Sequence, residues 1–131
     1  MVSRSGQMAG LAALADARFR AEQGRLAVLR RKQAALEAQI AELSRARAGA
    51  AALPLDDPAT RTGADLKWQA WVARRITALN MELARLRAEI EVERARLAKL
   101  FGQSVAASRL GRRLALEESR LQETRAEREG R

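Results

Sequence analysis

Two glutamates are the residues whose types and spacing come closest to supporting chemistry in this chain. Glu22 and Glu93 are the only acidic residues at the regularly spaced apolar positions of two long segments. The chain contains no histidine and no cysteine, so the usual general base, the commonest metal ligand and any thiolate nucleophile are missing. We therefore expect no catalytic residue, no metal site, no cofactor and no small-molecule substrate.

The positions that frame these glutamates form two tracks with alternating spacings of three and four residues. The first track is Met8, Ala12, Ala15, Phe19, Glu22, Leu26, Leu29, Gln33, Leu36, Ile40 and Leu43. The second is Val72, Ile76, Leu79, Leu83, Leu86, Ile90, Glu93, Leu97 and Leu100, and it weakens before recovering at Leu114 and Leu121. A repeat sustained over four or more heptads predicts a coiled-coil seam. Each track is too narrow to bury itself, so each helix needs a partner.

The amino-acid composition favours long helices over a compact core. Aromatic residues make up 3% of the chain, and Ala, Leu, Arg, Glu and Gln dominate it. The first residues, MVSRSGQMAG, contain no apolar run of signal-peptide length, and no stretch approaches the roughly 18 apolar residues that span a membrane. We therefore expect a cytoplasmic protein.

One helix-breaking stretch divides the chain. The segment GAAALPLDDPATRTG (49–63) contains both prolines and begins and ends with glycine. Proline ends helices, and Asp and Gly favour turns. The sequence therefore predicts a single all-α domain with helix one at about 6–48, a connector at about 49–64 and helix two at about 65–128. The two helices should form an antiparallel coiled-coil hairpin, with Asp65 or Thr62 capping the second helix.

Aligning the seam layers outward from the connector predicts a register. It pairs Leu36 with Leu79, and it places Glu22 opposite Glu93. Two interpretations of this carboxylate pair remain open. Either each side chain turns outward to a neighbouring arginine, or the two form a polar layer that sets the register at some cost in stability. A thin two-helix seam offers no pocket for a catalytic pair.

The same register leaves residues beyond about 110 without a partner, so 111–131 should project as an overhanging helix. This segment keeps an apolar stripe beside several arginines, and an exposed stripe of this kind requires a cover. We therefore predict that its partner-binding residues are Arg112, Arg113, Leu114, Arg120, Leu121 and Arg125.

Both tryptophans, Trp68 and Trp71, directly follow the connector and flank the seam at the tip of the hairpin. They either pack on Leu53, Leu55 and Leu66 to seal the hairpin end, or form a partner-binding patch, because Trp is common at interface hot spots. Stacking on nucleic acid is disfavoured, because the adjoining connector is acidic and would repel phosphate.

The stretches LAALADARFRAEQGRLAVLRRKQAALEAQIAEL (11–43) and SRLGRRLALEESRLQETRAEREGR (108–131) resemble the FliJ/YscO family, the stalk proteins of flagellar and type III export ATPases. The first is similar to that family's opening helix, and the second to its closing Arg-Leu-Glu segment. The resemblance implies a non-enzymatic stalk in the central opening of an ATPase ring. It also implies contact with the export gate or export chaperones, at the cytoplasmic face of a membrane-embedded export apparatus.

The net charge of +9 admits other partners as well. One alternative is a generic structural coiled coil that oligomerises through its exposed C-terminal stripe. Another is a basic nucleic-acid-associated protein. Acidic residues interleaved along both helices argue against this last role, since helices that lie in the major groove are nearly all basic.

Overall fold

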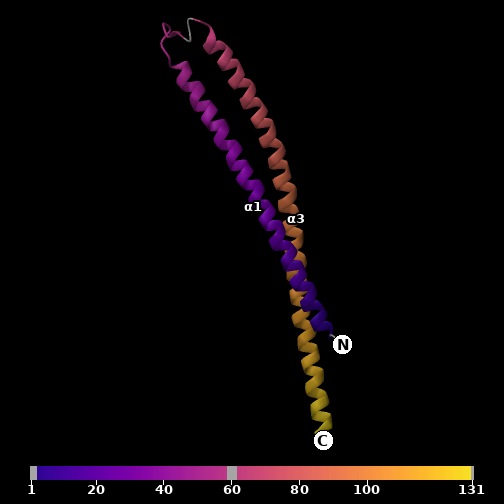
Figure 1. Ribbon diagram of the computed structural model, residues 1–131. Coiled ribbons are helices and arrows are strands. Elements are labelled where there is room, and N and C mark those ends of the chain that lie inside the picture. The colour runs from indigo at the N-terminus through magenta and orange to yellow at the C-terminus, as the bar shows by residue number, and fades with distance from the viewer. Residues whose placement is uncertain (1–2, 59–61, 131) are drawn as a thin grey trace. The chain divides into compact units, whose positions relative to one another are not determined.

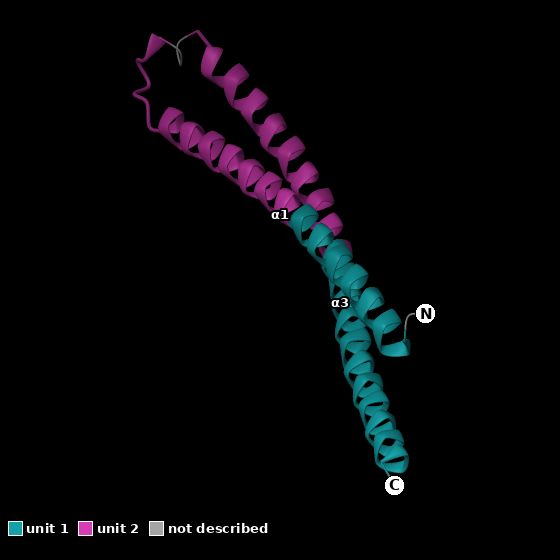
Figure 2. Ribbon diagram, turned by 60° about the horizontal axis from the view of Figure 1, so that its bottom comes forward, with its two compact units in different colours: residues 1–26, 93–131 teal, residues 27–92 magenta. Residues whose placement is uncertain are grey.

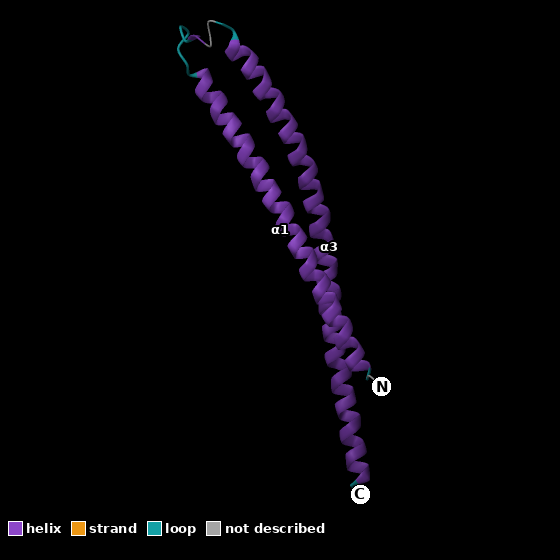
Figure 3. Cartoon of the chain, in the orientation of Figure 1, coloured by secondary structure: helices purple, strands orange, loops and turns teal. Residues whose placement is uncertain are grey.

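The chain folds as two long helices joined by a short connector. The computed structural model describes residues 3–58 and 62–130. Helix α1 comprises Arg4–Ala51 and helix α3 comprises Ala64–Glu129 (Figure 1). The two helices pack against each other, and neither described range contains a strand (Figure 3). The predicted all-α class and helical hairpin are confirmed.

The hairpin divides into two compact units (Figure 2). The first unit comprises residues 1–26 and 93–131, and the second unit comprises residues 27–92. Each unit contains one stretch of α1 and one stretch of α3, and the second unit also contains the connector. Each unit is therefore a helix pair held by its own length of seam.

The seam consists of the predicted positions. The buried residues of α3 are Val72, Leu79, Leu83, Leu86, Ile90, Glu93, Leu97 and Leu100. On α1, Leu29 is buried and the other members of the predicted track are half-buried. Burial along α3 follows the alternating spacing of three and four residues, as expected for one apolar stripe packed on one partner.

Both helices start and stop close to the predicted positions, with differences at the connector. Helix α1 continues to Ala51 rather than ending at about residue 48, because its last residues are mostly alanine, the best helix former. Helix α3 begins directly after Gly63, whose φ of +73° suits glycine. Asp65 lies inside the first turn of α3, so it is not the capping residue. Its charge there is still favourable at a helix N-terminus.

In the first unit Glu22 meets Glu93, as the predicted register requires. That register would place Met8 opposite Ala107. Met8 also lies against Gly111, four residues further along α3, its Cβ atom 3.5 Å from the position that a Cβ atom on Gly111 would take. The prediction that 111–131 is unpaired is therefore wrong for its first residues, and pairing continues to Glu118.

Truncation of the most buried leucine tests this seam. Leu79 is 1% exposed, and we expect Leu79→Ala to lower the free energy of unfolding by about 2–5 kcal/mol through lost apolar burial and a cavity. Leu66 lies on the same helix but is 71% exposed, so Leu66→Ala should change stability by no more than about 0.5 kcal/mol. Urea unfolding followed by circular dichroism measures both. Equal effects would contradict the assigned seam.

Candidate functional site

The two seam glutamates meet in the first unit. Glu93 is buried, with 3% of its surface exposed, and the side chain of Glu22 is 25% exposed. Their carboxyl groups lie beside the same arginine atom, Arg96 Nη1, and each has a buried oxygen without a hydrogen-bond partner among the described residues. An ionised carboxylate has acceptors and no donor, so a hydrogen bond between the two would require a proton on one of them. The structure therefore brings together the two residues that the sequence singled out.

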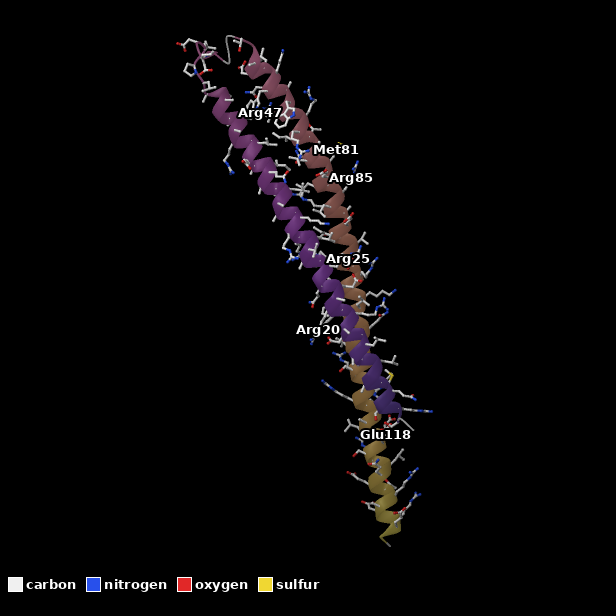
Figure 4. All side chains as sticks on the ribbon, in the orientation of Figure 1. Arg20, Arg25, Arg47, Met81, Arg85 and Glu118 are labelled. Carbon is white, nitrogen blue, oxygen red and sulfur yellow. The ribbon has the colours of Figure 1, made fainter. Side chains whose placement is uncertain are left out.

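Two arginines reach toward this pair from the rim of the seam. The Arg96 Nη1 atom lies 3.4 Å from Glu93 Oε2 and 3.9 Å from Glu22 Oε2. The Arg25 Nε atom lies 3.9 Å from Glu93 Oε2, and Figure 4 labels Arg25 on α1. Glu93 stays buried in the seam, and both carboxylates face arginines at its rim. The contacts therefore contain elements of both interpretations.

The surroundings of Glu93 raise its pKa above the usual value. The largest cause is the hydrogen bond with Glu22, followed by burial of the carboxyl group and by the negative charge of Glu22. The charges of Arg96 and Arg25 act in the opposite direction. This arrangement forms a polar layer in a helix seam. Within residues 3–58 and 62–130, no group of side chains could hold a metal ion.

A second carboxylate of the first unit has the opposite environment. Glu118 of α3, labelled in Figure 4, accepts hydrogen bonds at the start of α1. The backbone N–H of Ser5 donates to Glu118 Oε1 at 3.1 Å, and the Ser5 hydroxyl donates to Oε2 at 2.5 Å. Ser3 caps the same helix end, because its Oγ atom accepts from the Gly6 N–H at 3.1 Å. Glu118 thus ties the start of α1 to α3.

Sequence analysis missed the contact between Ser5 and Glu118. The signal was present in the spacing, because Gly111, Leu114 and Glu118 continue the track of α3 by steps of three and four. A polar residue at a seam position opposite a helix N-terminus is a candidate cap. The predicted register hid this signal, because it left nothing opposite residues beyond about 110.

Removing this cap has a defined pH dependence. Hydrogen bonds from the Ser5 hydroxyl and backbone lower the pKa of Glu118 below 4.5. The stabilisation is therefore present above about pH 4.5 and is lost as the pH falls through the lower folded value. We expect Glu118→Gln to lower the melting temperature at pH 7, with the difference from the native protein shrinking toward pH 3.

The neighbouring Glu117 is exposed, so Glu117→Gln is a matched control that should leave the melting temperature unchanged. Thermal unfolding followed by circular dichroism across this pH range measures both variants. A Glu118→Gln effect that persists undiminished at pH 3 would contradict the proposed role of the ionised carboxylate.

The structure divides the predicted C-terminal residues into two groups. Leu114 is half-buried in the seam, and Arg112 and Arg113 lie beside it on the paired part of α3. Arg120, Leu121 and Arg125 lie beyond Glu118. All side chains from residue 121 to residue 130 are exposed. The exposed end of α3 is thus shorter than predicted and begins after Glu118.

The tip of the second unit separates the two tryptophans. Trp68 is half-buried, whereas Trp71 is 50% exposed. The three leucines expected beneath them are exposed, at 43% for Leu53, 89% for Leu55 and 71% for Leu66. These leucines therefore do not form a packed cover at the hairpin end. The environments of the two side chains favour a packing role for Trp68 and a surface role for Trp71.

Single substitutions distinguish these two roles. We expect Trp68→Ala to lower the melting temperature, because it removes partly buried apolar surface. We expect Trp71→Ala to leave melting nearly unchanged and, if Trp71 is a binding hot spot, to weaken partner binding by about 2 kcal/mol or more. Calorimetry of each variant and titration with the partner measure the two effects. Equal melting of the two variants would argue against this division.

No model of a protein family, no curated protein and no solved structure matches this chain. Across the described ranges, no helix is both long enough and apolar enough to cross a membrane.

Proposed function

We propose that the protein is a non-enzymatic central stalk or adaptor of a flagellar or type III protein-export ATPase. One observation carries the proposal: α3 continues as a helix to Glu129, eleven residues beyond Glu118, which accepts hydrogen bonds from Ser5 of α1. Its side chains from residue 121 onward are exposed. A helical end whose side chains are exposed in the described structure suits insertion into the opening of a ring. The resemblance of residues 11–43 and 108–131 to the FliJ/YscO family supports this direction.

The overhang, residues 119–129, carries charges of both signs and one large apolar residue. Arg120, Arg125 and Arg128 alternate with acidic residues, and Leu121 is 61% exposed. Such a surface can exchange ion pairs with polar pore loops while the ring subunits change state, because exposed ion pairs are individually weak. No single contact then fixes the stalk in one position.

The second unit offers a separate contact surface. Trp71 is half-exposed at the tip, and the exposed Leu55 and Leu66 lie near it in the sequence. Exposed apolar groups of this size favour a protein partner. In the proposed role this tip contacts the export gate or export chaperones at the cytoplasmic face of the apparatus. The stalk itself supplies position and coupling, and it needs no substrate or cofactor.

Self-association through the C-terminal part of α3 is the second candidate function. It is supported by three exposed leucines of the first unit, with exposed fractions of 44% for Leu110, 60% for Leu116 and 61% for Leu121. Leu114, expected in the same stripe, is half-buried and does not contribute fully. Sedimentation equilibrium distinguishes this candidate, because only self-association makes the apparent mass rise with protein concentration.

Deleting residues 119–131 tests the stalk proposal. This deletion keeps Glu118 and the whole seam, so the melting temperature should change little. We expect the truncated chain to lose binding to the cognate export ATPase and to lose any stimulation of ATP turnover, measured by pull-down and phosphate release. Replacing Arg120, Arg125 and Arg128 by Gln should weaken binding and flatten its dependence on salt.

A deletion of residues 112–131 is the matched comparison, because it also removes Glu118. It should lower the melting temperature in addition to abolishing binding. If the 119–131 deletion binds and stimulates the ATPase normally, the overhang is not the inserted element, and the stalk proposal loses its main support.

A further inference from the structure

The polar layer of the first unit contains more hydrogen-bonding capacity than the chain satisfies. Among the described residues, Glu93 is the one charged residue that is buried. Its Oε1 atom, and the Oε2 atom of Glu22, are buried and have no hydrogen-bond partner among the described residues. Buried carboxylate oxygens left in this state are costly. The layer must therefore relieve two negative charges placed side by side.

The neighbouring arginines do this only in part. Arg25 and Arg96 are the cationic groups that act on Glu93, one from each of the two helices that form the layer. Their side chains are 63% and 47% exposed. Two of the three nitrogen–oxygen distances to the glutamates are 3.9 Å, too long for hydrogen bonds. In the third contact Arg96 Nη1 donates a hydrogen bond to Glu93 Oε2 at 3.4 Å. The arginines leave the buried Glu93 Oε1 and Glu22 Oε2 atoms without a hydrogen bond.

A proton shared between the two carboxyl groups supplies the hydrogen bond that their buried oxygens lack. One protonated carboxyl donates to the other, as in carboxylate pairs that share a site and titrate as a unit. We propose that the folded hairpin holds one shared proton between Glu22 and Glu93, and that losing this proton loosens the pairing of α1 and α3 in the first unit. This inference is independent of the proposed function and holds for any partner.

The sign of the effect follows from the direction of the titration. The pKa of Glu93 is raised in the folded protein, above its ordinary value of 4.5. The layer therefore imposes no penalty below about pH 4.5, and stability falls as the pH rises through the folded pKa. The seam around this layer should open more readily at higher pH. This trend is opposite to that of Glu118, whose contribution is lost at low pH.

Glu93→Gln tests the proposal in the full chain. Glutamine has nearly the same shape, donates to Glu22 without a titrating proton and keeps the layer polar. We expect the variant to melt at a higher temperature than the native protein at pH 8, with the advantage disappearing toward pH 4. Glu22→Gln should behave in the same way. Glu89→Gln, a change at an exposed position of the same helix, should show neither effect.

Carbon-13 NMR of the glutamate carboxyl groups supplies a second measurement. The resonance of the Glu93 carboxyl group should titrate with a step displaced upward from the ordinary range. Amide hydrogen exchange in residues 93–100 should accelerate over the same pH interval after correction for intrinsic rates. The proposal is overturned if Glu93→Gln melts lower at pH 8, because the arginines then hold two ionised carboxylates. Titration of the Glu93 carboxyl group at its ordinary value would also overturn it.

Discussion

The narrowness of the apolar stripe on each helix is the constraint on which the rest of this structure depends. Neither stripe can be buried except against the other, so folding back at the connector is the cheapest solution within one chain. Alanine and leucine supply most of the apolar surface, and few bulky aromatics are present to build a rounded core. The seam determines where the polar features lie. The Glu22–Glu93 layer lies within the seam, and the contact of Glu118 with Ser5 lies at the start of α1. The two tryptophans lie beside the connector.

The sequence alone predicted the elements and the seam well, because both depend on local spacing. All the tracked residues of α3 from Leu79 to Leu100 are buried. The register was harder to predict. In an antiparallel pair each seam residue faces a hole between two layers, so alignments half a heptad apart look equally good. The contacts of Met8 with Gly111 and of Ser5 with Glu118 show that the pairing extends further along α3 than the predicted layers did. Helix ends carry a weak sequence signal.

The candidate sites differ in the same way. Features that depend on residue spacing along one helix were predictable, and features that depend on the detailed pairing of the two helices were not. Glu22 and Glu93 could be recognised as partners because both interrupt an apolar track. The hydrogen bonds from Ser5 to Glu118 could not be predicted, because they depend on where α1 begins relative to α3. Burial at the tip also escaped prediction, since two tryptophans three residues apart face different surroundings. The two carboxyl environments shift the pKa in opposite directions. The pKa of Glu93 is raised by the hydrogen bond with Glu22, by burial and by the like charge, and the pKa of Glu118 is lowered by donated hydrogen bonds.

The hydrogen bonds between Ser5 and Glu118 mark the boundary between two lengths of α3, the paired length and the exposed end. The paired length is counted in heptads between the connector and these hydrogen bonds, while the exposed length is counted in residues after Glu118. Inserting seven residues into each helix would extend the pair and keep both the register and the overhang. Inserting seven into only one helix would displace every layer and break these hydrogen bonds. In a chain built this way, the length of the helix pair and the length of the exposed end of α3 can therefore vary independently of each other.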